Sequence, residues 1–415
     1  MDRRTFLQST SAPLGAAALA SILPAAASAT PGPAQTGRRH GAAPSTDVAV
    51  IGGGAFGAWT ALTLREMGHR VTLVDAYGPG NSRATSGDET RQVRVGYGDR
   101  EGYARMAHRA MDAWRTREAE FGIPLLTTTG RLEIAPDWTP SLRATQAMLA
   151  RFGVPTEAFT ADELRRRYPQ MGFDGIGVGL LEPGAGVVRA KQAILAAADA
   201  FRRKGGTLTI QRAAPGRAQG SRLEDLALAD GTRLAAQQFV FACGPWLPKV
   251  FPELLGRRIH VPKRDVLYFG VPAGDPRFAP PALPNFSESA YYGFPSIDGR
   301  GVKVCPTNGP DTWDPDTDER IVDPMQVRRA RAYLARRFPA LAAQPITETR
   351  VCQLENTDDE HFIVDRHPAY ANVLIAGGGS GHAFKHGPVL GDYVARRAVG
   401  DATDPTFDAM VRLSR

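Results

Sequence analysis

Cysteine is scarce in this 415-residue chain, which contains only Cys243, Cys305 and Cys352. The three cysteines form no C-x-x-C pair and no Cys/His spacing typical of a structural metal site. We therefore expect neither a disulfide framework nor a bound metal ion. An odd number of cysteines suggests that one thiol has a use other than pairing.

Long apolar runs and long basic runs are also missing. No segment after residue 29 approaches the about 18 consecutive apolar residues that span a bilayer, so we expect no membrane span. The formal net charge is +7, but the arginines are scattered and lack interleaved aromatic residues. This pattern favours a solvated basic surface over nucleic-acid binding. The 43% hydrophobic and 22% charged content is typical of a globular enzyme, and we expect a monomer.

Residues 1–29 contain the three parts of a twin-arginine signal peptide in order. Arg3 and Arg4 give a basic start, an apolar stretch follows, and Ala27-Ser28-Ala29 matches an A-x-A cleavage site. Residues 30–45 are rich in Pro, Gly and Ser, which predicts a flexible linker. We therefore expect an exported protein, either periplasmic or extracellular.

A nucleotide-binding fingerprint opens the mature chain. Residues 47–51 read as a buried parallel strand, and Gly52, Gly54 and Gly57 follow in G-x-G-x-x-G spacing before a helical segment. Gly52 permits the tight turn, Gly54 lets backbone N–H groups approach a pyrophosphate, and Gly57 lets helix and strand pack closely. A second strand ends in Asp75, which can accept hydrogen bonds from a ribose. The motif predicts a dinucleotide without separating FAD from NAD.

The segment after Asp75 favours FAD. An NAD-binding domain usually continues with another strand and helix, whereas residues 78–94 form a long polar stretch rich in hydroxyl groups and arginine. Such a loop suits an extended dinucleotide with a flavin at one end. Near the C-terminus, residues 352–385 concentrate a cysteine, two histidines and a lysine, together with the glycine-rich run GGGSGHAFK.

The fingerprint, the polar loop and residues 352–385 together resemble the flavin-dependent amine oxidases of the D-amino-acid-oxidase superfamily, and within it the sarcosine and N-methyltryptophan oxidases. The resemblance implies an FAD cofactor and an α/β fold. A Rossmann-like FAD-binding domain of the glutathione-reductase type would interleave with an α+β substrate domain carrying a mostly antiparallel sheet. The FAD-binding domain would comprise residues 46–130, 188–247 and 345–415, and the substrate domain residues 131–187 and 248–344.

The resemblance also implies roles for individual residues at the substrate. The R-x-x-R pair places Arg91 near the flavin and Arg94 on a substrate carboxylate. Lys385 is the second carboxylate ligand, and the Y-Y-G-F-P motif makes Tyr292 a residue of the substrate pocket. Lys303 falls on the lysine that the family uses to activate oxygen.

A second set of residues is implied at the cofactor. Cys352 matches the cysteine that forms a covalent thioether to the flavin, a bond that needs a thiolate, which nearby Arg or Lys would favour. Gly381, His382 and Phe384 match the flavin-contacting loop. His361 and His382 are expected to be structural or flavin-flanking and not general bases. Thr90, Ala213 and Lys385 complete the expected cofactor-binding residues.

The leading hypothesis is an FAD-dependent oxidase of a secondary amine or amino acid, which could be N-methylated, cyclic or an α-amino acid. It would give an imine and reduce molecular oxygen to hydrogen peroxide. Thr307 stands where the sarcosine enzymes have an active-site histidine, so we expect a carboxylate-bearing substrate other than sarcosine. Two alternatives are a dehydrogenase of the same fold that passes electrons to a quinone or carrier, and a flavin-binding protein without amine turnover.

Overall fold

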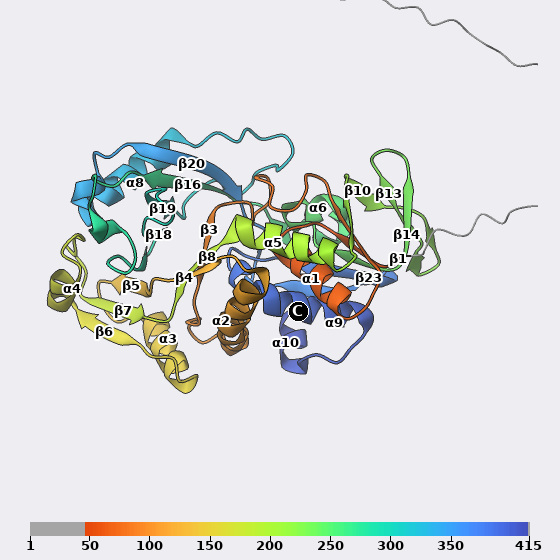
Figure 1. The fold of residues 1–415 in the computed structure, drawn as a ribbon, viewed down its shortest axis with the longest axis horizontal. Helices are drawn as coiled ribbons and strands as arrows, with labels where there is room; N and C mark the ends of the chain where they lie inside the picture. Colours follow the sequence, from red (N-terminus) through yellow and green to blue (C-terminus); the bar gives the residue numbers. More distant parts are fainter. Residues whose placement is uncertain (1–45, 414–415) are drawn as a thin grey trace, which may run out of the picture. The chain divides into compact units, whose positions relative to one another are not determined.

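Two eight-stranded sheets organise the fold, and the computed structural model describes residues 46–413 (Figure 1). The signal peptide and the linker predicted within residues 1–45 lie outside the described residues. The described chain belongs to one compact unit, and the boundaries proposed between an FAD-binding and a substrate domain stay a prediction. Among residues 46–413, no helix is both long and apolar enough to cross a membrane.

The first sheet has a parallel centre. Strands β9, β2, β1, β14 and β23 are neighbours in that order and run parallel, while the β10–β13 hairpin and β22 add antiparallel pairs at its edges. The strand bounds are β1 Thr46–Ile51, β2 Val71–Asp75, β9 Thr207–Ile210, β10 Ala213–Pro215, β13 Asp225–Leu228, β14 Arg233–Phe241, β22 Ile363–His367 and β23 Tyr370–Gly377. The strands at the centre are rich in Val, Leu, Ile and Phe because helices or loops cover both faces.

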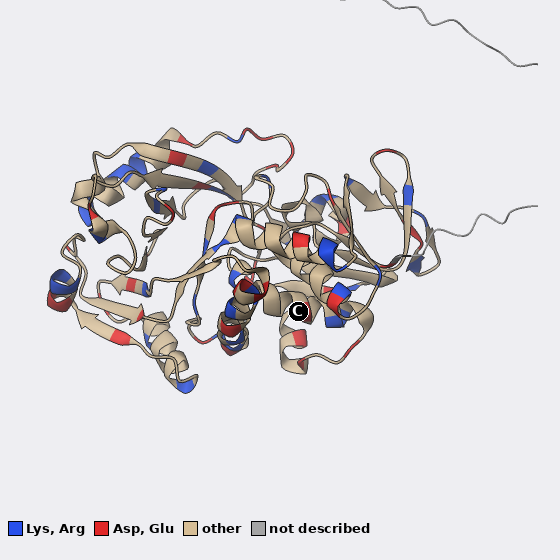
Figure 2. Cartoon of the chain, in the orientation of Figure 1, with Lys and Arg blue, Asp and Glu red and all other residues tan. Residues whose placement is uncertain are grey.

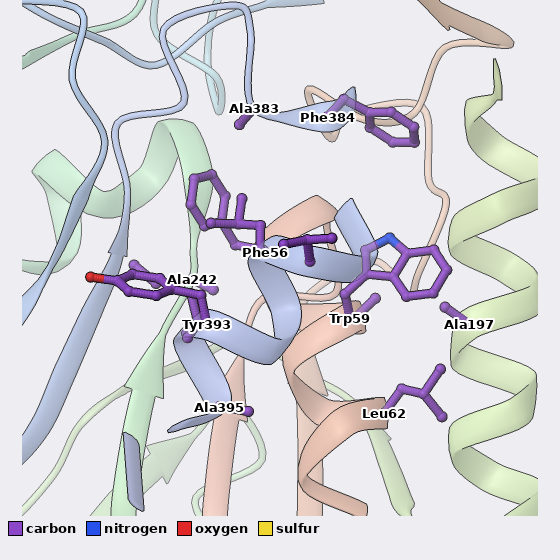
Figure 3. Close-up of a cluster of buried hydrophobic side chains, with 14 of the residues drawn as sticks. Phe56, Trp59, Leu62, Ala197, Ala242, Ala383, Phe384, Tyr393 and Ala395 are labelled. Carbon is purple, nitrogen blue, oxygen red and sulfur yellow. The ribbon is translucent and has the colours of Figure 1, made fainter. Parts of the chain in front are cut away.

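Helices α1 (Ala55–Glu66), α2 (Glu101–Phe121), α5 (Ala190–Arg203) and α9 (Gly387–Val399) pack with one face of this sheet. Figure 3 shows Phe56, Trp59 and Leu62 of α1 lying with Ala197 of α5 and Tyr393 of α9. Trp59 is fully buried and stacks edge-on against Trp114 of α2. Along α2, positive and negative side chains are interspersed (Figure 2). This core holds the N-terminal end of α1 in place directly after the glycine turn.

The second sheet is almost entirely antiparallel, as predicted. Its order is β20-β16-β19-β18-β17-β5-β7-β6, and only β17 and β5 run parallel. The bounds are β5 Arg131–Ala135, β6 Glu157–Thr160, β7 Val178–Glu182, β16 Lys263–Phe269, β17 Asn285–Glu288, β18 Tyr291–Phe294, β19 Val302–Pro306 and β20 Ile346–Gln353. Helix α8 (Pro324–Arg337) packs Ala330 and Leu334 against Leu267 and Val304 of this sheet. One face of the sheet is therefore apolar and covered.

A small third sheet has the order β3 (Thr90–Val93), β8 (Gly186–Arg189) and β4 (Leu126–Thr128). In the sequence, β3 and β4 precede strands β5, β6 and β7 of the second sheet, and β8 follows them. No helix follows β2 within residues 76–89, in agreement with the predicted polar loop. The remaining elements are α3 (Pro140–Arg151), α4 (Ala161–Arg167), α6 (Leu247–Val250), α7 (Pro252–Leu255), α10 (Pro405–Met410), β11 (Ala218–Gln219), β12 (Arg222–Leu223), β15 (Ile259–His260) and β21 (Asn356–Thr357), with 3-10 turns at Gly244–Trp246, Pro276–Phe278, Pro339–Leu341 and Phe384–His386.

Candidate active site

A cavity of about 350 Å³ lies where β1, β2 and β14 end. Open α/β sheets bind their ligands at this carboxyl edge. Its wall combines segments that are far apart in sequence, namely residues 51–56, 74–77, 81–86, 211–215, 242–250, 354–355 and 379–384, together with Arg91 and Asp316. The glycine fingerprint and the C-terminal segment therefore meet in space.

The glycine turn leaves no room for side chains at two positions. Gly52 has φ +103°, and a Cβ there would lie 2.2 Å from the carbonyl oxygen of Ala242. A Cβ on Gly57 would lie 1.8 Å from the carbonyl oxygen of Gly52, so α1 can approach the turn only through glycine. Gly54 is the N-cap of α1 and supplies no side-chain cap, and both Gly54 and Ala55 line the cavity. Helix N–H groups exposed in this way stabilise an anion such as a pyrophosphate.

Asp75 holds the other side of the turn. Its Oδ2 accepts a hydrogen bond from the Gly53 N–H at 2.6 Å, and its Oδ1 accepts one from the Tyr77 N–H at 2.8 Å. The carboxylate ends β2 and lines the cavity, where a ribose would lie beside a pyrophosphate held by α1. The donor set and the glycine cradle therefore fit the adenosine diphosphate half of FAD.

The predicted cofactor residues divide into two groups. Those that line the cavity are Gly52, Gly54, Asp75, Arg91, Ala213, Gly381, His382 and Phe384. Gly57 packs directly beneath Gly52, and Thr90, Cys352 and Lys385 are buried next to lining residues. Among the described residues, no group of three or more His, Cys, Asp or Glu could hold a metal ion.

Strand register gathers the predicted reactive side chains on one face of the second sheet. Tyr292 pairs with Cys305, and Lys303 pairs with Tyr268. Cys352 pairs with Arg264, which shares a face with Tyr268 because side chains alternate along β16. Since α8 covers the opposite face, this face is the one turned toward the cavity, which Arg91 and Leu354 line.

Asp88 is the centre of a buried charge cluster on that face, and sequence reasoning did not identify it. Lys303 Nζ donates to the carboxylate of Asp88 and, at 3.0 Å, to the Thr90 carbonyl oxygen. Arg91 Nη1 donates to Asp88 Oδ2 at 2.6 Å, and the Tyr268 hydroxyl donates to Oδ1 at 3.1 Å. Burial alone would raise the pKa of Asp88, but Lys303 and Arg91 hold it well below its usual range. Two cations share one carboxylate, which leaves one positive charge in excess.

Cys352 lies beside a cation, as predicted, but its thiol is not activated in this structure. Arg91 Nη2 is 3.5 Å from Cys352 Sγ. Burial raises the pKa of Cys352, and Arg91 opposes that shift without overcoming it. The neighbouring cation therefore favours the thiolate, as expected, but desolvation of the sulfur outweighs that effect, so the thioether stays a prediction.

Arg94 and Lys385 meet at Tyr97, which the sequence did not single out. Arg94 Cζ lies 4.7 Å from the centre of the Tyr97 ring, and Lys385 Nζ donates to the Tyr97 hydroxyl at 2.8 Å and to the His382 carbonyl oxygen at 2.7 Å. Burial, followed by the charges of Arg94 and Arg131, lowers the pKa of Lys385 well below its ordinary value. Burial and Arg131 likewise lower the pKa of Arg94.

Two acidic residues accompany these cations, and both are engaged. Glu133 forms an ion pair with Arg131 at 2.6 Å, and Glu182 accepts hydrogen bonds from the backbone N–H groups of Val95 and Gly96. Within the described part of the chain, Arg94 makes no ion pair. A buried cation without a partner is costly, so this cluster favours a bound anion.

Hydrogen bonds hold both His361 and His382 in place. His382 Nδ1 lies 3.1 Å from the Tyr97 hydroxyl, and its Nε2 lies 2.9 Å from the Glu360 carbonyl oxygen. Burial lowers the pKa of His382 to about 3, so it carries no charge near neutral pH. His361 Nδ1 lies 3.1 Å from the Tyr103 hydroxyl, whose oxygen accepts from the Phe362 N–H. Thr307 lies in the loop after β19, where its N–H donates to the Ala290 carbonyl oxygen at 2.8 Å.

The chain matches a family of known proteins over most of its length. The model of the family described as FAD dependent oxidoreductase matches residues 47–397. The chain is 30% identical to monomeric sarcosine oxidase of Streptomyces avermitilis, over 87% of this chain and 95% of that protein. It is 26% identical to N-methyl-L-tryptophan oxidase of Salmonella heidelberg, over 89% and 98% respectively.

A solved structure shares the same fold. L-proline dehydrogenase from P. horikoshii superimposes with a TM-score of 0.76 at 20% identity and covers 87% of this chain and 95% of its own. This likeness supports the α/β fold described above, with its parallel core and mostly antiparallel second sheet. The chain therefore belongs to the FAD-dependent oxidoreductase family and is an enzyme of the sarcosine oxidase type.

Proposed function

We propose that the protein oxidises the C–N bond of a secondary amine or amino acid that bears a carboxylate. The substrate loses two electrons and two protons to become an imine, and oxygen takes them up as hydrogen peroxide. The pairing of Arg94 with Lys385 on Tyr97 carries this proposal, because neither cation forms an ion pair among the described residues and the nearby Glu133 and Glu182 are engaged elsewhere. The named activities of the two relatives, on sarcosine and on N-methyl-L-tryptophan, support it.

FAD, when bound, supplies the redox chemistry by accepting a hydride equivalent from the substrate carbon. The residues of this chain bind, orient and exclude water. Arg94 can hold a carboxylate through two parallel N–H groups, while Lys385 acts as a point charge. Two fixed contacts to one carboxylate orient the neighbouring C–N bond, which is the geometric requirement for hydride transfer. Lys303 stabilises negative charge that develops on oxygen.

A dehydrogenase that passes electrons to a quinone or carrier is the second candidate. The ion pair between Lys303 and Asp88 favours it, because a cation already neutralised by a carboxylate stabilises oxygen less. The third reading, a flavin-binding protein without amine turnover, has no such observation in its favour. Export remains part of the proposal and rests on residues 1–29 alone, so a mature N-terminus at residue 30 would support it.

An anaerobic screen tests the function. Purified holoprotein mixed with N-methyl and cyclic amino acids, and with the corresponding amines that lack a carboxylate, is expected to lose its flavin absorbance with a carboxylate-bearing member of the set. Air is then expected to restore the colour with one peroxide formed per flavin. Bleaching without reoxidation in air selects the dehydrogenase. No bleaching by any amine would contradict both enzymatic readings.

We further propose that Cys352 tethers the flavin through a thioether. Its sulfur would replace one hydrogen of a flavin methyl group, the two electrons and two protons released would reduce the flavin, and oxygen would reoxidise it with formation of hydrogen peroxide. The support is its burial beside Arg91 and next to the cavity wall. Acid-precipitated wild-type protein is expected to stay yellow, and Cys352→Ala is expected to give a colourless pellet with yellow supernatant. Cys305→Ala is the matched control, since Cys305 is buried on the same sheet face and should keep the colour. Flavin released from the wild type would refute the tether.

A further inference from the structure

Glu355 is a buried acid in the cavity wall to which the proposed function assigns no role. It lies between β20 and β21, is 5% exposed and lines the cavity. Its Oε2 has no hydrogen-bond partner among the described residues. An unpartnered buried carboxyl oxygen is costly, and Glu355 lines a ligand cavity, which together point to a ligand contact.

The position of Glu355 along the cavity indicates which part of the cofactor it faces. Parallel strands β2, β1, β14 and β23 lie side by side, and the cavity runs along their carboxyl ends. Asp75 ends β2, and the glycine turn follows β1. Glu355 Oε2 lies 3.8 Å from where a Cβ on Gly244, just after β14, would stand, and 3.1 Å from the same point on Gly377, at the end of β23. Along the row of strand ends, Glu355 therefore lies past the pyrophosphate site at β1, in the part of the cavity that Arg91 and His382 also line.

Within residues 46–413, no charged side chain compensates Glu355. Burial raises its pKa to about 8, and only the backbone N–H groups of Gly378 and Gly379 oppose that shift. The Cys243 thiol is the titratable group on the strand-end side, and burial raises its pKa as well. The other titratable or charged groups around the same cavity are Asp75, Tyr77, Arg91, Arg212, Lys249, Asp316 and His382. Asp316 is paired with Lys249 and Arg212, and Arg91 with Asp88, so none of these cations is paired with Glu355.

We infer that Glu355 is a cofactor-binding residue whose neutral carboxyl group donates a hydrogen bond from Oε2 to a hydroxyl of the ribityl chain that joins the pyrophosphate to the flavin ring. The neutral form suits this place for two reasons. It can donate to a hydroxyl, which a carboxylate cannot. It also adds no negative charge beside a pyrophosphate. The inference rests on FAD as the cofactor of the family and needs no amine turnover.

FAD release tests this inference. The Cys352→Ala holoprotein removes any covalent tether, and the fluorescence of released FAD gives the dissociation constant between pH 6 and pH 9. Adding Glu355→Leu is expected to weaken FAD binding about five- to tenfold at pH 7, because one hydrogen bond is lost. Adding Glu355→Gln retains a donor and is expected to bind within about threefold.

The pH dependence of the FAD dissociation constant shows whether Glu355 binds FAD as a neutral acid or only fills space in the cavity wall. With Glu355 present, the dissociation constant is expected to rise about tenfold from pH 7 to pH 9 as the carboxyl ionises, whereas Glu355→Gln stays flat. Asp316→Asn is the matched control, because it removes an acid of the same cavity that is already paired and should leave the rise intact. A rise that persists in Glu355→Gln, or FAD binding by Glu355→Leu equal to the parent at pH 7, would overturn the inference.

Deoxygenated cofactors identify the partner group. Three FAD analogues, each lacking one ribityl hydroxyl, are compared in the parent and in Glu355→Leu. One analogue is expected to bind about five- to tenfold more weakly to the parent and unchanged to the Leu variant, because the same hydrogen bond is then lost only once. Additive losses for all three analogues would exclude the ribityl contact. Because no amine is added, failure here is distinct from failure of the proposed oxidation.

Discussion

Arg94→Gln is expected to lower kcat/KM for the carboxylate-bearing amine by about 10²- to 10³-fold. Truncating one partner of a buried hydrogen-bonded charge pair costs roughly 2–5 kcal/mol, and each 1.36 kcal/mol is tenfold in rate. The same variant is expected to melt no lower than the wild type. Arg94 is half-buried without an ion pair in the described chain, so its removal relieves a desolvation cost and the repulsion from Lys385.

The pH profile of kcat/KM provides a second readout for this site. Lys385 binds a carboxylate while protonated, so affinity is lost as pH rises through its pKa, which burial and then Arg94 and Arg131 lower. In Arg94→Gln one of these repulsive charges is gone, and the alkaline limb is expected to move to higher pH. Arg94→Lys keeps the charge and should leave the limb in place, with a smaller loss of kcat/KM because the paired N–H contacts are absent.

Arg105→Gln is the matched control for Arg94. Arg105 lies on the exposed side of α2 and pairs with Glu101 at 2.6 Å, so its loss should change kcat/KM by less than about twofold. Equal kcat/KM in Arg94→Gln and wild type for every carboxylate-bearing substrate would remove the clamp from the mechanism. An equal loss for amines that lack a carboxylate would show a positional role and not a carboxylate contact.

Lys303→Met is expected to slow reoxidation of the reduced enzyme by oxygen about 10²- to 10³-fold, while anaerobic reduction by substrate stays within about fivefold. The reason is the excess positive charge of the cluster formed by Asp88, Arg91 and Lys303, which the substitution removes. Stopped-flow absorbance measures the two half-reactions separately. The variant is also expected to melt at a lower temperature, because Asp88 loses one of its buried partners.

Lys263→Met and Lys303→Arg make this experiment decisive. Lys263 is likewise buried in β16 and donates to the Ile321 carbonyl oxygen at 2.6 Å, so its loss costs stability without touching the cluster. Lys303→Arg keeps the positive charge and should retain most of the oxygen reactivity. Unchanged reoxidation in Lys303→Met would leave the lysine as a structural partner of Asp88 and favour the dehydrogenase.

The sequence predicted those parts of the site that depend on local pattern. The strand from Thr46, the glycine spacing and Asp75 are contiguous, and steric limits at Gly52 and Gly57 leave the turn few alternatives. The short apolar runs of the first sheet were recognisable for the same reason. The first half of β14, which begins at Arg233, has no such apolar run, because it alternates exposed and half-buried residues in a hairpin with β13.

Long-range contacts account for what the sequence did not disclose. Asp88 precedes the arginine pair in a visibly polar loop, but its role depends on Lys303, which is 215 residues away. The Tyr97 hydroxyl is contacted by Lys385, His382 and His386, which are 285 to 289 residues later in the sequence, so Tyr97 could not be recognised from its own neighbours. The neutral thiol of Cys352 follows from burial, which no motif reports. The sequence did not identify Glu355 as a site residue, because a single acid between two strands is usually exposed and only the structure shows that this one is buried.

The dispersed wall of the cavity has a consequence for the order of events in synthesis. The turn at Gly52 leaves the ribosome long before Glu355, β23 and the loop at Gly381. β23 must also pair with β14 before that loop can close over the carboxyl edge. A chain that lacks β23 and this loop therefore has no complete cofactor site, and FAD can be enclosed only after both have been made. If the protein is exported through residues 1–29 with FAD inside, its transport has to wait for these later segments.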